Sequence, residues 1–316
     1  MVCLSLAGCD GPQSALNAAG KGAEETLELL LWMAAGAGLI WIIVIGAAVY
    51  AMRAETGRLS VRAARLLIAG GGIAFPTALL FVLLVFGLRL LPEASAPGED
   101  LRIAVEGERW WWRVRYEPRG GTPVASANEI RLPVGARTEF RLTTADVIHS
   151  FWIPSLGGKI DMIPGRTTRL ALEPTATGVF RGVCAEFCGT SHALMAFDVV
   201  VMEQPEFDAW LRNQAQPAEP PSDSVGERGM ALFLDNGCGA CHRIAGTPAN
   251  GVIGPDLTHV GSRRSIGAAT LPASVEGFAR WIGHTDAVKP DVRMPTYDML
   301  TTAQLRAIGR YLSGLQ

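Results

Sequence analysis

Two long uncharged stretches near the start of the chain are the feature that most restricts its fold. Residues 29–52 and 66–88 contain 24 and 23 consecutive residues without a charged side chain. A helix needs about 20 apolar residues to cross the hydrocarbon core of a bilayer. Because a core helix of this length and purity is not expected in a soluble protein, the stretches predict a transmembrane helical hairpin over residues 27–92.

The connection between the two stretches carries an excess of positive charge. Its charged residues are one acid, Glu55, and four arginines, Arg53, Arg58, Arg62 and Arg65. Loops rich in Lys and Arg stay on the cytoplasmic side of a membrane. We therefore expect both termini, and the whole chain after the second stretch, to be extracytoplasmic.

A short motif precedes the first stretch. Residues 6–9 read Leu-Ala-Gly-Cys, which resembles a bacterial lipobox, where the signal is cut before a cysteine that receives a lipid. Only eight residues precede Cys9 and none is Lys or Arg, so a charged start and a full apolar segment are missing. The motif predicts lipidation of Cys9 within an N-terminal segment of residues 1–26, with a coincidental tetrapeptide as the alternative.

Composition excludes three broad classes of protein. Hydrophobic residues make up 49% of the chain, charged residues 18%, and the formal net charge is −2. A disordered chain needs low hydrophobicity and high net charge, and a nucleic-acid binder usually has a basic face. Six cysteines in 316 residues are also too few for a disulfide scaffold. We expect a folded membrane protein without a nucleic-acid partner.

The pattern changes after residue 100 to short β-rich runs separated by Gly- and Pro-containing turns. Several short strands at this spacing indicate an all-β sandwich or barrel over residues 93–214. The predicted strands are residues 101–106, 110–116, 129–132, 139–143, 167–172, 178–183 and 195–202.

One loop of this region concentrates soft metal ligands. Two thiols (Cys184 and Cys188), an imidazole (His192) and a thioether (Met195) fall within 12 residues, and His149 lies 35 residues before the first thiol. Sulfur and imidazole together favour copper. Zinc would accept the thiols and imidazoles but gains little from a thioether. A disulfide between the two cysteines is the main alternative, because the predicted compartment is oxidising.

A second redox motif follows a Pro-rich linker at residues 215–225. Cys238, Cys241 and His242 form the C-x-x-C-H signature of covalent c-type haem attachment, in which the thiols bond the haem vinyl groups and the histidine binds the iron. A thioredoxin-type pair is disfavoured by the adjoining histidine and by the lack of a βαβ pattern. We expect a small all-α cytochrome domain over residues 226–316.

The second haem ligand is expected downstream of this motif. Met294 precedes a proline and a predicted last helix at residues 301–312, the usual position of the methionine in cytochrome c domains. His/Met ligation raises the haem potential, which suits an electron carrier. Met299 is the runner-up, and His259 and His284 are weaker candidates.

Two further predictions concern the surroundings of the haem. Residues 253–257 resemble the cytochrome c segment near the proximal side of the haem, and this resemblance implies that the carbonyl of Pro255 orients His242 by accepting from its ring. Arg263 and Arg264 are predicted to be solvated surface charges, with contact to a haem propionate as the alternative.

Separate motifs of the middle region, in the right order, resemble subunit II of cytochrome c oxidase. They are His-Ser-Phe-Trp-Ile-Pro at 149–154, Asp-Met-Ile-Pro-Gly-Arg at 161–166 and C-x-E-x-C-x-x-x-H-x-x-M at 184–195. The resemblance covers roughly residues 27–215. It implies a cupredoxin-like all-β Greek-key domain behind the two membrane helices.

The resemblance also implies a binuclear copper A centre in that domain. Cys184 and Cys188 would bridge two coppers, and His149 and His192 would bind one copper each. Met195 and the backbone carbonyl of Glu186 would complete the ligand set.

Two further roles are implied by the same family. The Glu186 side chain would reach a magnesium ion at the interface with the catalytic subunit, the alternative being a solvated carboxylate. Trp110, in the run Trp110-Trp111-Trp112, matches the position where electrons enter the copper site, the alternative being ordinary packing.

With its haem motif, the chain resembles the cytochrome-c-carrying (caa-type) form of this subunit in bacterial plasma membranes. The implied function is electron input: soluble cytochrome c donates, and electrons pass by haem c and copper A to a catalytic subunit I that reduces O2, alongside other oxidase subunits. The chain has five histidines, none of them in the uncharged stretches, so the O2 site, which needs several intramembrane imidazoles, must lie in another subunit. A copper-A subunit of a nitric oxide reductase and a membrane-anchored copper chaperone are the alternatives.

Overall fold

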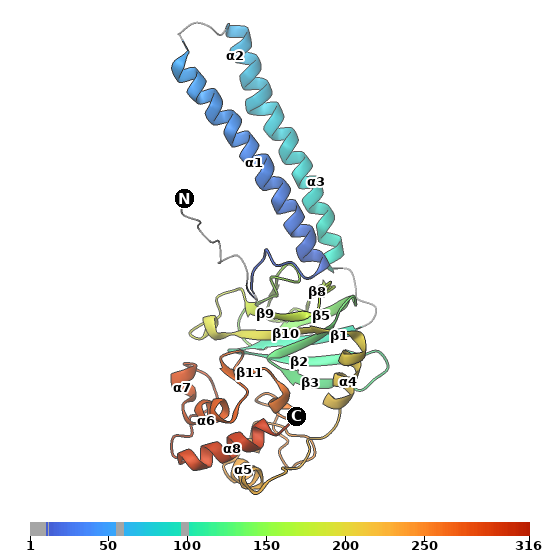
Figure 1. Cartoon of the computed structure of the whole chain (residues 1–316), viewed down its shortest axis with the longest axis vertical. Coiled ribbons are helices and arrows are strands. Elements are labelled where there is room, and N and C mark those ends of the chain that lie inside the picture. Colours follow the sequence, from blue (N-terminus) through green and yellow to red (C-terminus); the bar gives the residue numbers. More distant parts are fainter. Residues whose placement is uncertain (1–10, 12, 55–59, 96–100) are drawn as a thin grey trace, which may run out of the picture. The chain divides into compact units, whose positions relative to one another are not determined.

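The computed structural model describes residues 11, 13–54, 60–95 and 101–316 (Figure 1). It divides the chain into two compact units, Glu25–Ala96 and the remainder. The lipobox with Cys9, and Glu55 and Arg58 of the basic connection, lie outside the described residues. The predictions that concern them therefore stay predictions.

The two uncharged stretches are helical, as the sequence predicts. The first is α1 (Lys21–Arg53), and the second is built from α2 (Val61–Leu67), the π-helical segment η1 (Ile68–Ala74) and α3 (Phe75–Ser95). Both are long and apolar enough to span a membrane, and their most apolar windows are not buried within the protein. The sequence analysis did not predict the π-helical turn. Pro76 has no N–H to donate, and the glycines at 70–72 place no Cβ in the way of a wider turn.

The middle region is a β-sandwich, which confirms the predicted fold class. One five-stranded sheet has the order β3 (Val124–Ala127), β2 (Trp111–Pro118), β1 (Leu101–Glu108), β5 (Thr138–Thr144) and β8 (Thr168–Leu172). The other has the order β4 (Glu129–Pro133), β10 (Ala196–Met202), β9 (Gly178–Cys184), β6 (His149–Trp152) and β7 (Ile160–Met162). Every predicted run overlaps a strand, whereas β3, β6 and β7 were not predicted.

An aromatic cluster fills the space between the two sheets. Trp112, Phe151 and Phe197 are fully buried. The ring of Phe197 stacks on Phe151 at 5.0 Å between centroids and meets Trp112 edge-on at 5.2 Å. Such contacts add to the free energy gained from burial alone. This cluster lies directly behind His149, whose ring is 6.2 Å from that of Trp112.

Gly182 leaves the space that Phe197 occupies, which gives a test of this packing. The two residues face each other on β9 and β10, and a Cβ on Gly182 would lie 2.0 Å from the phenyl ring. We expect Gly182→Ala to lower the free energy of unfolding by about 1–3 kcal/mol, because the enclosed ring cannot move away. The control is Gly158→Ala, since Gly158 is exposed and a Cβ there would meet nothing within 4 Å. Equal denaturant midpoints for the two variants would contradict this packing.

The C-terminal region is a small helical module, as predicted. After α4 (Gln204–Gln214), its main helices are α5 (Ser224–Asp235), α6 (Val275–Gly283) and α8 (Thr302–Ser313), with α7 (Thr285–Val288) a single turn. The remaining short elements are η3 (Cys238–Ala240), η4 (Val260–Ser262), β11 (Ser265–Ile266) and β12 (Leu271–Pro272). Helix α8 packs against both α5 and α6.

Local sequence explains where the last helix begins and how it packs. The hydroxyl of Thr301 accepts from the Gln304 backbone N–H, and the Gln304 side chain accepts from that of Thr301, a complete capping box. Helix α5 approaches α8 at Gly229, where a Cβ would lie 2.0 Å from the carbonyl oxygen of Ala307. Any larger residue there would separate the two helices.

The Pro-rich linker forms hydrogen bonds with the helical module. The N–H of Ala218 donates to the carbonyl of Ala245 at 2.9 Å, and the carbonyl of Gln216 lies 3.0 Å from Nε2 of His259. The linker therefore packs along the helical module. Consistently, the β-sandwich and the helical module belong to the same compact unit.

Candidate copper and haem sites

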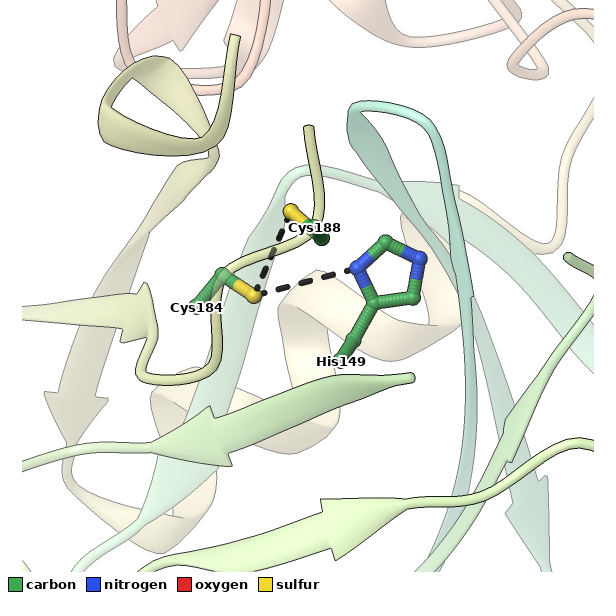
Figure 2. Close-up of side chains that lie close together, drawn as sticks. All are labelled: His149, Cys184 and Cys188. Atoms are coloured by element: carbon green, nitrogen blue, oxygen red, sulfur yellow. Dashed lines mark hydrogen bonds between the residues drawn. The ribbon is translucent and has the colours of Figure 1, made fainter. Parts of the chain in front are cut away.

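The sheet topology brings the predicted copper ligands together. His149 is the first residue of β6 and Cys184 the last of β9, and these strands are hydrogen-bonded neighbours. Cys188 lies in the loop that connects β9 to β10. Figure 2 shows the side chains of these three residues converging, and their ligand atoms lie within 4.8 Å of one another.

The two thiols form the centre of this cluster. The sulfur atoms of Cys184 and Cys188 are 3.7 Å apart and not bonded to each other, so the disulfide alternative is wrong for this structure. All the other predicted ligands contact one of the two sulfurs. These contacts are His149 Nδ1 at 3.8 Å and the Glu186 carbonyl at 3.2 Å from Cys184, and His192 Nδ1 at 3.4 Å and Met195 Sδ at 3.8 Å from Cys188.

The thiols titrate as a pair. The hydrogen bond from Cys188 lowers the pKa of Cys184, and the same bond, together with burial, raises the pKa of Cys188. A metal ion bound here would take both sulfurs as thiolates, because a coordinated thiol is deprotonated. Two free sulfurs, two imidazoles, a thioether and a carbonyl oxygen form a donor set that fits copper.

Asp146 orients one of the imidazoles, a role that the sequence analysis missed. Its carboxylate lies 3.0 Å from Nε2 of His149 and accepts from the Arg109 backbone N–H at 2.9 Å. Burial opposes charge on both groups. The hydrogen bonds of the two side chains outweigh this effect of burial, so the pKa of His149 is raised and that of Asp146 is lowered. An acid three residues before a metal-binding histidine is the signal that could have identified it, because such histidines commonly bond a carboxylate.

Trp110 contacts the loop that carries Cys188. Strand β2 begins at Trp111, so the predicted strand 110–116 is wrong by one residue. Trp110 lies in the turn before it and is nevertheless only 5% exposed. Its indole N–H donates to the carbonyl of Cys188 at 2.9 Å. Gly189, with φ +114°, leaves space for the indole, since a Cβ there would lie 3.0 Å from the ring.

The helical module encloses a largely apolar cavity that holds the haem motif. Cys238, Cys241, His242 and Met294 all line it. Both cysteines are free and partly accessible. The opposite wall comes from the β-sandwich and includes Trp110. Other lining side chains are Phe233, Ile266, Phe278, Trp281, Ile282 and Leu312.

His242 is held in the state that a haem ligand requires. Burial lowers the pKa of its imidazole, which keeps the ring neutral. Nδ1 donates to the carbonyl of Pro255 at 2.9 Å, as the sequence predicts, so Nε2 is free to bind a metal. A Cβ on Gly254 would lie 2.5 Å from the ring, and therefore only glycine permits this approach.

The candidates for the second haem ligand occupy very different positions. Met294 lines the cavity, and its sulfur accepts from the Trp281 indole at 3.1 Å. Met299 is 71% exposed, and His284 is exposed as well. His259 is buried, but its ring nitrogens face the carbonyls of Gln216 and Gln316. The structure therefore favours Met294.

Arg263 contradicts the prediction that it is a solvated charge. It is buried, lines the cavity and donates to the Asp256 carbonyl at 2.6 Å, and burial lowers the pKa of its guanidinium. In the described part of the chain its Nε is one of the few buried polar atoms without a hydrogen-bond partner. A buried cation with an unused donor fits an anionic propionate. Arg264, by contrast, is exposed as predicted.

The Glu186 side chain has a different environment from its carbonyl. The carboxylate is exposed, and the described cluster of metal-binding side chains, His149 with the two thiols, does not include it. Magnesium at this position therefore stays a prediction.

Comparison with known proteins finds a family model for each of the two regions that carry these residues. The family model "Cytochrome C oxidase subunit II, periplasmic domain" matches residues 120–203, and the cytochrome c model matches residues 226–316. Cytochrome c oxidase subunit 2 of Alkalihalophilus pseudofirmus is 36% identical over 225 residues, covering 71% of this chain and 64% of the relative. The Bacillus subtilis protein of the same name is 31% identical over 228 residues, with 69% and 63% covered.

A solved structure is also similar over part of the chain. The periplasmic domain of subunit II of cytochrome oxidase from Bradyrhizobium japonicum is 35% identical, with a TM-score of 0.35, and covers 37% of this chain and 95% of that one. The chain spans slightly less than two thirds of the length of the curated relatives it matches.

The fold and the two sites define a membrane-anchored protein with a cupredoxin-like copper domain and a cytochrome c domain. The family models and relatives specify this class further. The chain combines a match to the periplasmic domain of cytochrome c oxidase subunit II with a C-terminal cytochrome c domain, and it is similar to bacterial subunit 2 proteins.

Proposed function

We propose that this chain is the electron-input subunit of a terminal cytochrome c oxidase. It accepts electrons from soluble cytochrome c and delivers them to a catalytic subunit that reduces O2 to water. The observation that best supports this proposal is the position of Trp110, whose indole N–H bonds the carbonyl of Cys188 while its side chain lines the cavity of the helical module. A single side chain thus contacts both redox sites.

Each site has residues suited to hold its group. Cys238 and Cys241 would attach haem c, with His242 and Met294 as axial ligands and Arg263 facing a propionate. Two coppers would be held by His149, Cys184, Glu186 through its carbonyl, Cys188, His192 and Met195. When bound, these groups supply reversible one-electron chemistry, and no side chain of this chain needs to act as general acid, base or nucleophile.

The β-sandwich suits electron transfer because it holds its ligands rigidly. His149 and Cys184 end adjacent strands, and Asp146 fixes the imidazole of His149. Ligands held by packing and by outer hydrogen bonds keep one geometry in both redox states. The chain itself therefore has little to rearrange when the charge of the site changes.

The same position of Trp110 changes the route expected for electrons. The resemblance to the oxidase family makes Trp110 the entry point for an external donor. Here it is buried and borders the cavity of the chain's own cytochrome c domain. We therefore infer that Trp110 receives electrons from the built-in haem and that soluble cytochrome c reacts with the helical module.

The remaining proposals concern location and partners. We propose that the chain lies in a bacterial plasma membrane with two spans and both termini outside, bound to catalytic subunit I and other oxidase subunits. Neither uncharged stretch contains a histidine, which supports placing the O2 site in a partner. Magnesium at the Glu186 carboxylate would belong to that interface.

Metal analysis with EPR of the purified full-length protein tests this function. We expect two coppers and one covalently bound haem iron per chain, and an oxidised spectrum from a delocalised mixed-valence copper pair. An isolated type-two cupric signal would contradict the copper A assignment. A copper chaperone should release its copper to a chelator and has little use for covalent haem. In a nitric oxide reductase, the associated large subunit would reduce nitric oxide instead of O2.

A further inference from the structure

Lys289 is a buried lysine that neither redox site uses. The chain has only three lysines, Lys21, Lys159 and Lys289. Lys289 follows α7 in the cytochrome c domain, five residues before Met294, and is 1% exposed. Lysine is almost never fully buried unless its charge is compensated. The position therefore requires an explanation.

Backbone carbonyls provide that compensation, and two of the three come from the copper domain. The Lys289 ammonium donates to the carbonyl of Trp110 at 2.6 Å, to that of Leu194 at 2.9 Å and to that of Gly267 at 2.9 Å. An ammonium has three donors, so all of them are used. Only the Gly267 carbonyl belongs to the cytochrome c domain itself.

Both partners in the copper domain adjoin the copper site. The side chain of Trp110 bonds the carbonyl of Cys188, and Leu194 immediately precedes Met195. The next residues of the same segment continue the contact. The Ser191 hydroxyl donates to the carbonyl of Pro290 at 2.6 Å, and Val292 packs against the core of the β-sandwich. The segment between α7 and Met294 thus lies on the copper loop.

The hydrogen bonds of Lys289 stabilise the contact between the cytochrome c domain and the copper domain. Burial lowers the pKa of the Lys289 amine to about 7, but only its charged form has three N–H donors for the three carbonyls. Hydrogen bonds from a charged donor are roughly twice as strong as neutral ones. If the domains separated, the ammonium would have to be resolvated, and the Trp110 and Leu194 carbonyls would lose their partner. Other contacts also join the domains, such as that of Arg113 with the Val252 carbonyl at 3.1 Å and that of the Arg264 backbone N–H with the buried Glu129 carboxylate at 2.7 Å. Lys289 differs from them because one side chain holds two carbonyls of the copper domain at once.

We propose that Lys289 is a positioning residue that locks the cytochrome c domain onto the copper domain, so that electron transfer between the two sites needs no docking step. This inference rests on the proposed function, because it assumes that haem and copper are bound. It adds that the built-in donor is held in place and is not a tethered carrier that must find its acceptor. A tether alone would only raise the effective concentration of the donor.

Electron-transfer kinetics of the full-length protein test the proposal. The haem is reduced by a short pulse of reductant and the copper absorbance is followed. We expect a fast, single-phase transfer that is independent of solvent viscosity. In Lys289→Met the transfer should slow by about tenfold, because lost contacts of this kind shift equilibria by at least that factor. The slower transfer should also depend on viscosity, since docking would then limit the rate.

The matched control is Lys159→Met, which removes an exposed lysine of the copper domain. We expect this variant to match the unaltered protein in rate and in viscosity dependence. The haem absorption and copper EPR spectra should be the same in all three proteins. An unchanged, viscosity-independent rate in Lys289→Met with both groups bound would overturn the proposal. A role confined to the fold of the cytochrome c domain would not introduce viscosity dependence.

A second measurement needs no variant and therefore does not depend on whether Lys289→Met folds. The native full-length protein is treated with a water-soluble amine-acetylating reagent, and labelled peptides are quantified by mass spectrometry. We expect Lys159 to react and Lys289 to react at least about tenfold more slowly, because its amine is enclosed while the domains are docked. Equal labelling would overturn the proposal. Loss of copper or haem would contradict the proposed function, whereas this labelling result reports on docking alone.

Discussion

A Cys188→Ser variant is expected to lose its copper completely and to keep its haem. The sulfur of Cys188 lies 3.4 Å from Nδ1 of His192, 3.8 Å from the Met195 sulfur and 3.7 Å from that of Cys184. Serine offers a hard hydroxyl oxygen that does not bridge coppers, and copper prefers soft thiolate ligands. The substitution nearly preserves side-chain volume, so the β-sandwich should still fold.

Metal content and optical spectra measure this outcome directly. The copper content should fall from two per chain to zero, while the covalent haem stays at one per chain, because its ligands lie in a separate module. Thr190→Ala is the matched control, since Thr190 is an exposed residue of the same loop. It should keep both groups. If Cys188→Ser lost both groups, or neither, the two sites would not be independent and our assignment would be wrong.

The second large effect is expected for Met294→Leu. The haem should remain attached through Cys238 and Cys241, but the iron should lose its thioether ligand. We expect the haem potential to fall by about 0.1 V or more, a small part of the roughly 0.8 V range that axial ligands control. Loss of the methionine-to-iron charge-transfer band should accompany it. Leucine has a similar volume, so the cavity should remain packed.

Met299→Leu is the control for that experiment. Met299 is 71% exposed, whereas Met294 lines the same cavity as the C-x-x-C-H segment. Redox titration of Met299→Leu should reproduce the unaltered potential. A lower potential in Met299→Leu combined with an unchanged one in Met294→Leu would reassign the ligand to Met299.

Several features of this protein follow from local sequence. The helical spans depend on composition alone, since more than 20 consecutive uncharged residues satisfy a bilayer without any other part of the chain. The C-x-x-C-H segment is equally local, because its thiols and imidazole adjoin one another. The orientation of His242 by Pro255 could also be predicted, because cytochrome c segments share this pattern around the haem.

Other features depend on which segments meet in space. Asp146 is an ordinary acid in the sequence, and it becomes a partner of His149 only because the turn before β6 folds back on the ring. Arg263 is adjacent to Arg264 and was predicted to share its solvation. Only the tertiary packing distinguishes them, burying Arg263 beside the haem cavity and leaving Arg264 exposed.

The sequence by itself determined the membrane hairpin, the β-sandwich, the helical module and the candidate metal ligands, because each depends on residue type and spacing along short segments. Only the tertiary structure decided how the two redox modules relate to each other. Trp110, Leu194 and Lys289 are far apart along the chain, and no periodicity connects them. Their contact arises from long-range packing. The cost of burying the Lys289 ammonium is offset only when the carbonyls of Trp110, Leu194 and Gly267 all surround it.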